Sequence, residues 1–227
     1  MAGRLAAAVR AAARCAALLA LALLAALPAG PARAEGEPAG DFDYYVMALS
    51  WQPGWCDREG RARGAEGCDP GDGLGWILHG LWPQYEAGWP SYCPTPERNP
   101  SRAETAAMAD IMGSGGLAWH QWNKHGRCTG LSAARYFALS REAYGGVVRP
   151  PAFRRLDGPV RLPARVVEAA FLEANPGLEA DMLTVTCTDG DIHEVRICLD
   201  RALSPRRCAA DVRRDCTAER ARMVPLP

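Results

Sequence analysis

Cysteine is the residue type that most constrains what this chain can fold into. Eight of its nine cysteines lie between residues 56 and 216, and an even number is typical of a disulfide framework when a chain is exported, as the N-terminal pattern described below predicts. They are Cys56, Cys68, Cys93, Cys128, Cys187, Cys198, Cys208 and Cys216. Eight cysteines allow 105 connectivities, so counting does not fix the pairing. A metal site is the alternative, but the absence of any Cys-x-x-Cys favours disulfides.

The first 34 residues have the pattern of a secretory signal peptide. An arginine-containing start precedes an apolar run over residues 16–27, which is too short to span a bilayer. Ala32-Arg33-Ala34 matches the small-x-small cleavage pattern, so we expect cleavage after Ala34 and removal of the ninth cysteine, Cys15. An uncleaved anchor is the alternative. The mature chain, residues 35–227, is expected to be secreted or periplasmic.

Charge is distributed unevenly along the chain. The whole sequence carries 26 basic and 26 acidic side chains, but residues 1–34 hold four arginines and no acid. The remainder therefore has 22 basic against 26 acidic groups, a net charge of −4. This balance disfavours a protein that binds polyanions through a large cationic face. A nucleic acid partner would have to be bound locally.

Hydrophobic patterning predicts a single α+β domain, with a central antiparallel sheet and several helices stabilised by disulfides. Strands are expected over residues 43–51 and 75–81, and a hairpin around an Asp-Gly turn over residues 183–188 and 192–200. Helices are expected over residues 101–112, 117–125, 132–144 and 163–174. Loops are expected over residues 52–75 and 85–100, and an irregular tail after residue 201. Without an internal repeat or linker, the mature chain reads as one domain.

One motif that can carry chemistry is His79-Gly80-Leu81-Trp82-Pro83-Gln84. Gly80 frees the backbone directly after the imidazole, and Pro83 stiffens the exit. This arrangement can present His79 and the face of Trp82 at the end of a strand. By itself the motif is weak, because a histidine near a strand end is more often structural.

The other motif covers residues 119–126, Trp-His-Gln-Trp-Asn-Lys-His-Gly. Residues three and four apart share a helix face, so one edge can carry His120, Gln121, Lys124 and His125, while Trp119 and Trp122 anchor the other side. A zinc site is disfavoured, because zincins place two histidines four apart around a glutamate. The alternative is a packed aromatic helix with incidental polar groups.

The two motifs together supply histidines, the only lysine of the chain and aromatic platforms. This inventory suits phosphodiester transfer in RNA, where the 2′-hydroxyl needs a base and the 5′-oxygen needs an acid. Two imidazoles can perform both proton transfers near neutral pH without a metal. A fixed ammonium can stabilise the charge that grows on the phosphorus oxygens.

In this order, and in a cysteine-rich exported chain, the motifs resemble the ribonuclease T2 family. Residues 79–83 resemble its first active-site segment, and residues 122–126 followed by Cys128 resemble the core of its second. Residues 48–53 and 197–200 resemble family strands. The likeness covers most of residues 42–216.

The resemblance implies an endoribonuclease that cleaves single-stranded RNA with low base specificity. A 2′,3′-cyclic phosphate would form first and then be hydrolysed to a 3′-phosphate. His125 would be the general base and His79 the general acid. His120 would hold a phosphate oxygen, and Lys124 would stabilise the pentacovalent species. RNA would be the substrate, with no metal, no cofactor and no membrane attachment after signal removal, and the protein would be a monomer.

The resemblance also implies base contacts and a disulfide pairing. Trp82 and Gln84 fall where relatives contact a base, with Trp89 and Tyr92 as weaker candidates. The implied pairs are Cys56–Cys68, Cys93–Cys128, Cys187–Cys216 and Cys198–Cys208. The second pair would tie the loop after the first motif to the end of the second motif.

Gln121 departs from the family pattern, in which glutamate is usual. Glutamine can hydrogen-bond, but it cannot carry charge or transfer a proton. Gln121 therefore leaves open a catalytically weak family member that binds RNA or protein. A disulfide-rich exported binding domain unrelated to RNA is a separate alternative. A further histidine, His193, lies with Asp191 and Glu194 in the hairpin and is expected on a solvated strand face.

Overall fold

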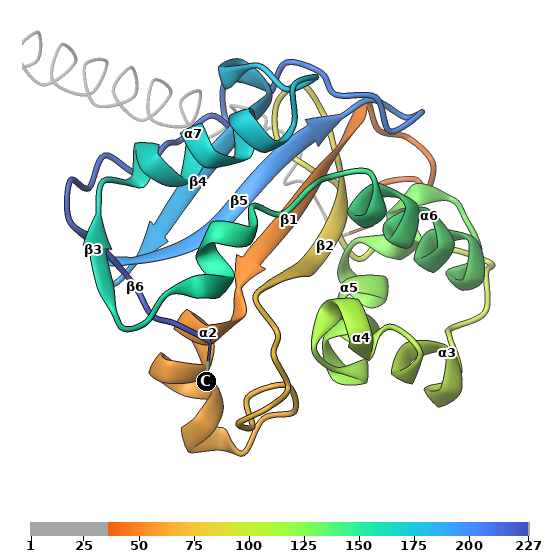
Figure 1. Cartoon of the computed structure of the whole chain (residues 1–227). Coiled ribbons are helices and arrows are strands. Elements are labelled where there is room, and N and C mark those ends of the chain that lie inside the picture. Colours follow the sequence, from red (N-terminus) through yellow and green to blue (C-terminus); the bar gives the residue numbers. More distant parts are fainter. Residues whose placement is uncertain (1–35, 227) are drawn as a thin grey trace, which may run out of the picture. The chain divides into compact units, whose positions relative to one another are not determined.

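A computed structural model describes residues 36–226, and the predicted signal peptide lies outside the described residues. Its strands form one six-stranded sheet in the order β2-β1-β5-β6-β3, with β4 paired to β5 off this path (Figure 1). The strands are β1 (Tyr44–Trp51), β2 (Trp76–Gln84), β3 (Val160–Leu162), β4 (Leu183–Thr188), β5 (Asp191–Leu199) and β6 (Ala221–Met223). The predicted α+β class is confirmed. The sheet is mixed, because β5 and β6 pair in parallel while the other pairs are antiparallel.

The helices begin where serine side chains can satisfy free backbone N–H groups. Ser101, Ser114 and Ser132 each accept a hydrogen bond from the backbone of the first helical turn. The helices are α2 (Gln52–Trp55), α3 (Arg102–Ala106), α4 (Ala109–Met112), α5 (Gly115–Lys124), α6 (Ala133–Gly145) and α7 (Ala164–Ala174). Within the described residues, no helix is long and apolar enough to cross a membrane.

Three expected segments differ from the structure. The tail after residue 201 was expected to be irregular, but it contains β6, which pairs with β3 and β5. The expected helix over residues 101–112 is divided into α3 and α4, where the Thr105 hydroxyl bonds back to the Ser101 and Arg102 carbonyls and competes with regular helix geometry. The expected loop over residues 52–75 starts as helix, because Pro53 lies in the first turn of α2, where its missing N–H costs nothing. A π-helical turn and a 3-10 turn continue this segment to Arg63.

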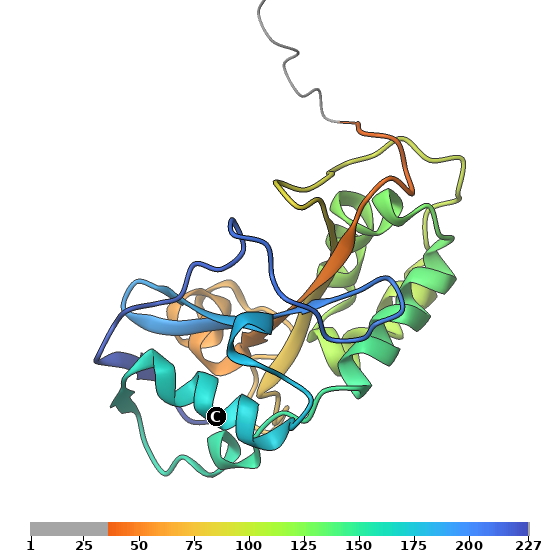
Figure 2. The ribbon, with the colours of Figure 1, turned by 90° about the horizontal axis from the view of Figure 1, so that it is seen from above.

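Strand β1 lies in the middle of the fold, and all eight of its residues are buried. Tyr45, Met47, Leu49 and Trp51 alternate along it and join the main hydrophobic core. Helices α4, α5 and α6 contact β2, and α7 contacts β4, so the helices gather over this core (Figures 1 and 2). The opposite face of β1 packs against other segments of the chain.

The opposite face of β1 is covered by the chain after β5. Tyr44 and Val46 join a small second cluster with Cys198, Cys208, Ala209 and Val212, against which Trp82 packs. The Cys198–Cys208 disulfide fixes this segment to the sheet. The other disulfides are Cys56–Cys68, Cys93–Cys128 and Cys187–Cys216, so all four pairings implied by the resemblance are confirmed.

Candidate functional site

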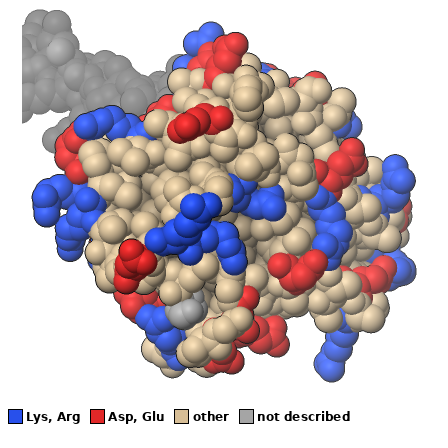
Figure 3. All heavy atoms as spheres, viewed as in Figure 1, with Lys and Arg blue, Asp and Glu red and all other residues tan. Residues whose placement is uncertain are grey.

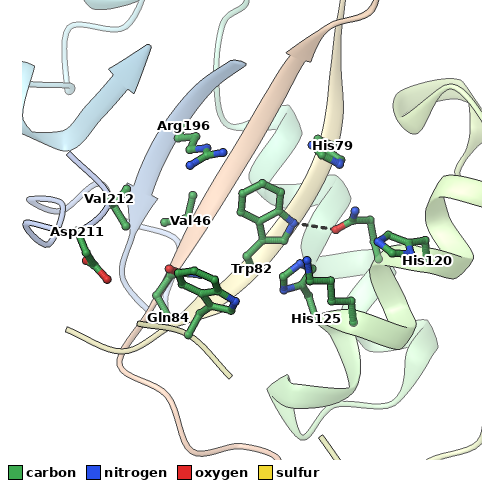
Figure 4. A pocket seen from close by; sticks show the side chains of 12 residues that line it. Val46, His79, Trp82, Gln84, His120, His125, Arg196, Asp211 and Val212 are labelled. Carbon is green, nitrogen blue, oxygen red and sulfur yellow. Dashed lines mark hydrogen bonds between the residues drawn. The ribbon is translucent and has the colours of Figure 1, made fainter. Parts of the chain in front are cut away.

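The two sequence motifs meet at a cavity of about 350 Å³ between the sheet and α5 (Figure 4). Strands and the C-terminal segment supply Val46, His79, Trp82, Gln84, Arg196, Asp211 and Val212, and Trp89 comes from the loop after β2. Helix α5 and its end supply His120, Gln121, Lys124 and His125. The structure therefore brings together eight of the nine predicted site residues. The ninth, Tyr92, is not among the lining residues, although its backbone N–H donates to the Lys124 carbonyl.

A β-bulge gives His79 its direction. Leu78 and Leu81 both lie in the main core, although residues three apart face opposite sides of a regular strand. The register resolves this conflict, because Ala48 pairs with Gly80 and Leu49 pairs with Leu78, which leaves His79 as the extra residue. A bulge re-aims the inserted side chain. His79 therefore lies on the cavity side, in the middle of β2 rather than at the predicted strand end.

Trp82 lies between the two histidines of the motifs. Its ring stacks on His125 with 5.3 Å between centroids and an angle of 28°, and it meets His79 edge-on at 5.3 Å and 79°. Its indole N–H donates to Gln121 Oε1 at 2.7 Å. A side chain at Gly80 would collide with both Trp82 Nε1 and Gln121 Oε1, so this close approach requires glycine. Trp82 thus sets the spacing between the imidazoles.

The end of α5 is held in place from several sides. Trp122 is buried and donates from Nε1 to Asn99 Oδ1 at 3.1 Å. His125 is the residue after the last helical turn, and the 3-10 turn that follows it contains Cys128 of the Cys93–Cys128 disulfide. A side chain at Gly126 would collide with Trp122 and Tyr136. These contacts leave the His125 ring little freedom to move.

Burial and neighbouring positive charge keep His125 neutral. Burial, followed by the charges of Lys124, His79 and His120, lowers the pKa of His125 to about 3. The pKa of His120 is also lowered, by burial and then by Lys124 and His79. His125 is therefore an uncharged imidazole at neutral pH, the form that can accept a proton.

Two residues of β5 belong to the site although the sequence analysis did not identify them. Glu194 is fully buried and its Oε1 lies 2.5 Å from His79 Nδ1, while Arg196 lines the cavity and lies over the Trp82 ring. The expected solvated face for His193, Asp191 and Glu194 is wrong. β5 is an interior strand between β1 and β4, so both acids are buried with arginine partners and His193 is only partly exposed.

The remaining predicted residues occupy the rim and floor of the cavity. Trp89 is 54% exposed at the rim, and buried Gln84 donates to the Pro83 carbonyl. His120 is exposed on α5 beside Gln121, which is buried. Among residues 36–226, no group of three or more His, Cys, Asp or Glu side chains is arranged to hold a metal ion.

Both motifs lie in a part of the chain that is similar to known proteins. The model of the ribonuclease T2 family matches residues 42–147, which include both motifs. Over these residues the chain is similar to the ribonuclease T2 family. A ribonuclease of Aeromonas hydrophila is 40% identical over 125 residues, 53% of this chain and 53% of the relative. Ribonuclease I of Escherichia coli is 31% identical over 165 residues, 55% of this chain and 61% of the relative.

The matches to curated relatives are partial, whereas the fold match covers 82% of this chain. The chain spans about half the length of the curated relatives it matches. Trichomaglin, described as an S-like ribonuclease, has a TM-score of 0.62 at 20% identity, covering 82% of this chain and 98% of that one. RNase NT in complex with 5′-AMP has a TM-score of 0.58 at 20% identity over the same shares. These structures show that the likeness of fold extends beyond the residues matched by the family model.

Proposed function

We propose that the protein is an endoribonuclease that cleaves single-stranded RNA by transphosphorylation. The observation that carries the proposal is the shared cavity. In it, His79 and His125 lie on either side of Trp82. Lys124 and His120 line the same cavity on the side of α5. In the reaction, the 2′-oxygen attacks phosphorus and the bond to the 5′-oxygen breaks. A 2′,3′-cyclic phosphate forms and is then hydrolysed to a 3′-phosphate.

The two imidazoles divide the proton transfers. His125, neutral because of its lowered pKa, takes the proton of the 2′-hydroxyl. His79 gives a proton to the departing 5′-oxygen. Lys124 and His120, which line the same cavity, stabilise the charge on the phosphate oxygens. This division needs no metal ion.

Substrate bases would stack beside the reacting phosphate. Trp82 and Trp89 offer aromatic faces, and Gln84 adds an amide to the lining of the cavity. Stacking accepts any base, so we expect low base specificity. On the face shown in Figure 3, basic and acidic side chains are interspersed, which fits local binding rather than one extended cationic surface.

Cleavage of polymeric RNA in the presence of a chelator tests this function. We expect chain-internal cuts at an undiminished rate with excess EDTA, because no step uses a metal. Binding without cleavage would instead support the weak family member that Gln121 suggests. If the protein neither binds nor cleaves RNA, the proposal is refuted, and a binding domain unrelated to RNA is the alternative that remains.

Export is part of the proposal. Four disulfides need an oxidising compartment to form and persist, which supports a secreted or periplasmic location. The proposed signal peptide over residues 1–34 would provide the route. Expression of residues 1–227 in a bacterial host, followed by N-terminal sequencing of the periplasmic protein, is expected to show a start at Glu35. Exclusive recovery of uncleaved chain in the membrane fraction would contradict it.

Restoring the usual carboxylate at position 121 is expected to move the pH–rate profile. In the Gln121→Glu variant, a negative charge next to His125 favours the imidazolium and raises the pKa of His125. The acidic limb of kcat/KM, where the base becomes protonated, should lie at higher pH in the variant than in the wild type. Profiles of both proteins on one RNA substrate measure the displacement. An acidic limb at equal or lower pH in the variant would contradict this assignment.

A further inference from the structure

We propose that Glu194 is a positioning residue that fixes His79 as the proton donor. This inference rests on the proposed ribonuclease function and deepens it. The chain lacks the family's usual glutamate at position 121, yet it holds a buried carboxylate against the other catalytic imidazole. The carboxylate that contacts a proposed catalytic imidazole therefore lies on β5, behind His79, and not on α5, while the cavity's other acid, Asp211, lies in the C-terminal segment.

Glu194 is held without freedom of its own. It is paired with Ser50 in the β1–β5 register, and Ser50 Oγ donates to Oε1 at 3.3 Å. Its Oε2 accepts from Arg196 Nε at 2.9 Å, with a second guanidinium nitrogen at 2.8 Å. Both carboxylate oxygens are thus engaged on an interior strand. This rigidity fixes the position of Oε1, and its contact with Nδ1 therefore fixes the orientation of the His79 ring.

The contact also fixes which nitrogen of His79 carries a proton. Burial raises the pKa of Glu194, but the hydrogen bond from His79 and the charges of His79, Arg196 and His193 outweigh it and lower the pKa to about 2. Glu194 is therefore an ionised acceptor at neutral pH, so His79 Nδ1 must be the donor. Nε2 is left as the nitrogen that can exchange a proton with substrate.

Several charged groups surround this pair, and most of them are cationic or neutral. They are His193 and Arg196 on β5, His120, Lys124 and His125 on α5 and its end, Arg58, Glu59 and Glu66 in the segment after β1, and Asp211 in the C-terminal segment. Among the described carboxylates, Glu194 is the one that bonds to His79. Its charge offsets the repulsion that the cationic groups exert on a protonated His79.

The chemistry follows from this geometry. The bond from phosphorus to the 5′-oxygen breaks with its electron pair on the oxygen, and His79 Nε2–H supplies the proton. His79 is left neutral, with its remaining proton on Nδ1 and still donated to Glu194. The carboxylate thus accepts the Nδ1 proton before and after the step, which leaves Nε2 as the nitrogen that gives up its proton, as an acid orients a catalytic histidine in other hydrolases.

Two substitutions at Glu194 test the proposal. Glu194→Gln keeps the shape and a hydrogen-bond acceptor without the charge, and Glu194→Ala removes both. We expect Glu194→Gln to lower kcat at least about tenfold with less than about threefold change in KM. The alkaline limb of its pH–rate profile should move to lower pH by about one unit. Glu194→Ala should show the larger loss in kcat.

Asp191→Asn is the matched control. Asp191 is also a buried, arginine-paired acid on β5, but it bonds to Arg58 and Arg222 and touches no imidazole. Its replacement should lower the melting temperature without moving the alkaline limb. Melting curves for all variants separate unfolding from a change in chemistry.

A readout that does not use activity separates this proposal from the ribonuclease function itself. Nitrogen-15 NMR of ring-labelled protein should show neutral His79 with its proton on Nδ1 in the wild type, and a shift toward Nε2–H in Glu194→Ala. Should the wild type fail to cleave RNA, the proposed function falls and this spectrum still decides the role of Glu194. A neutral Nε2–H ring in the wild type, or an active Glu194→Gln variant with an unchanged rate and profile, would overturn the proposal.

Discussion

Replacing His125 with alanine is expected to lower kcat/KM on RNA by about 10²- to 10⁴-fold, the usual contribution of a general base. The neutral ring that accepts the 2′-hydroxyl proton disappears, while Trp82 and the rest of the cavity wall stay in place. Removing a buried side chain also leaves a small cavity, so activity should be measured well below the melting temperature. Initial rates on a defined oligoribonucleotide provide the measurement.

His193→Ala provides the control for this prediction, since His193 is a half-buried imidazole that lies outside the cavity. We expect it to change kcat/KM by less than about tenfold. Equal losses in the two variants would mean that the effect of His125→Ala is structural. A His125→Ala variant with nearly full activity would contradict its assignment as the base.

Removing the Cys93–Cys128 disulfide is expected to lower the free energy of unfolding by about 4 kcal/mol. The two cysteines are separated by 35 residues, and a loop of this length gains substantial chain entropy in the unfolded state when its crosslink is removed. The pair also joins the loop after β2 to the turn that follows His125. Its loss should therefore reduce activity as well as stability. Urea denaturation of the Cys93→Ala, Cys128→Ala double variant measures the first effect, and RNA cleavage measures the second.

The Cys187–Cys216 disulfide is a control with a similar loop length. Its cysteines are separated by 29 residues and neither lines the cavity, so its removal should cost nearly the same stability but leave kcat/KM unchanged below the melting temperature. Equal activity in the two double variants would contradict the claim that Cys93–Cys128 positions the end of α5.

The core of the site could be predicted because its residues lie in two short stretches with their own local geometry. The spacing of His120, Gln121, Lys124 and His125 on one helix brings them to one edge wherever that helix packs. The direction of the His79 side chain could not be predicted from its own segment alone. Leu78 and Leu81 are both apolar and three residues apart, which is a signal for a bulge, but only the pairing with β1 shows that His79 is the inserted residue.

Glu194 and Arg196 could not be placed in the same way. They stand two residues apart, so they share one strand face, and an opposite-charge pair there reads as a solvated face when the neighbours of the strand are unknown. The order of strands shows that this face is buried, because β5 lies between β1 and β4. Asp211 and Val212 were missed for a related reason. They reach the cavity only because the Cys198–Cys208 disulfide folds the tail back over the sheet.

The central claim is that one imidazole takes the 2′-hydroxyl proton while the other gives a proton to the 5′-oxygen of the same phosphate. Phosphorus-31 NMR tests it most directly, with a dinucleoside monophosphate as substrate and EDTA present during turnover. The geometry predicts that a 2′,3′-cyclic phosphate accumulates first and later converts to a 3′-phosphate. In the His125→Ala variant, formation of the cyclic species should be slowed by the same factor as RNA cleavage. Direct release of a 5′-phosphate, or cleavage that never passes through the cyclic species, would contradict the proposed chemistry.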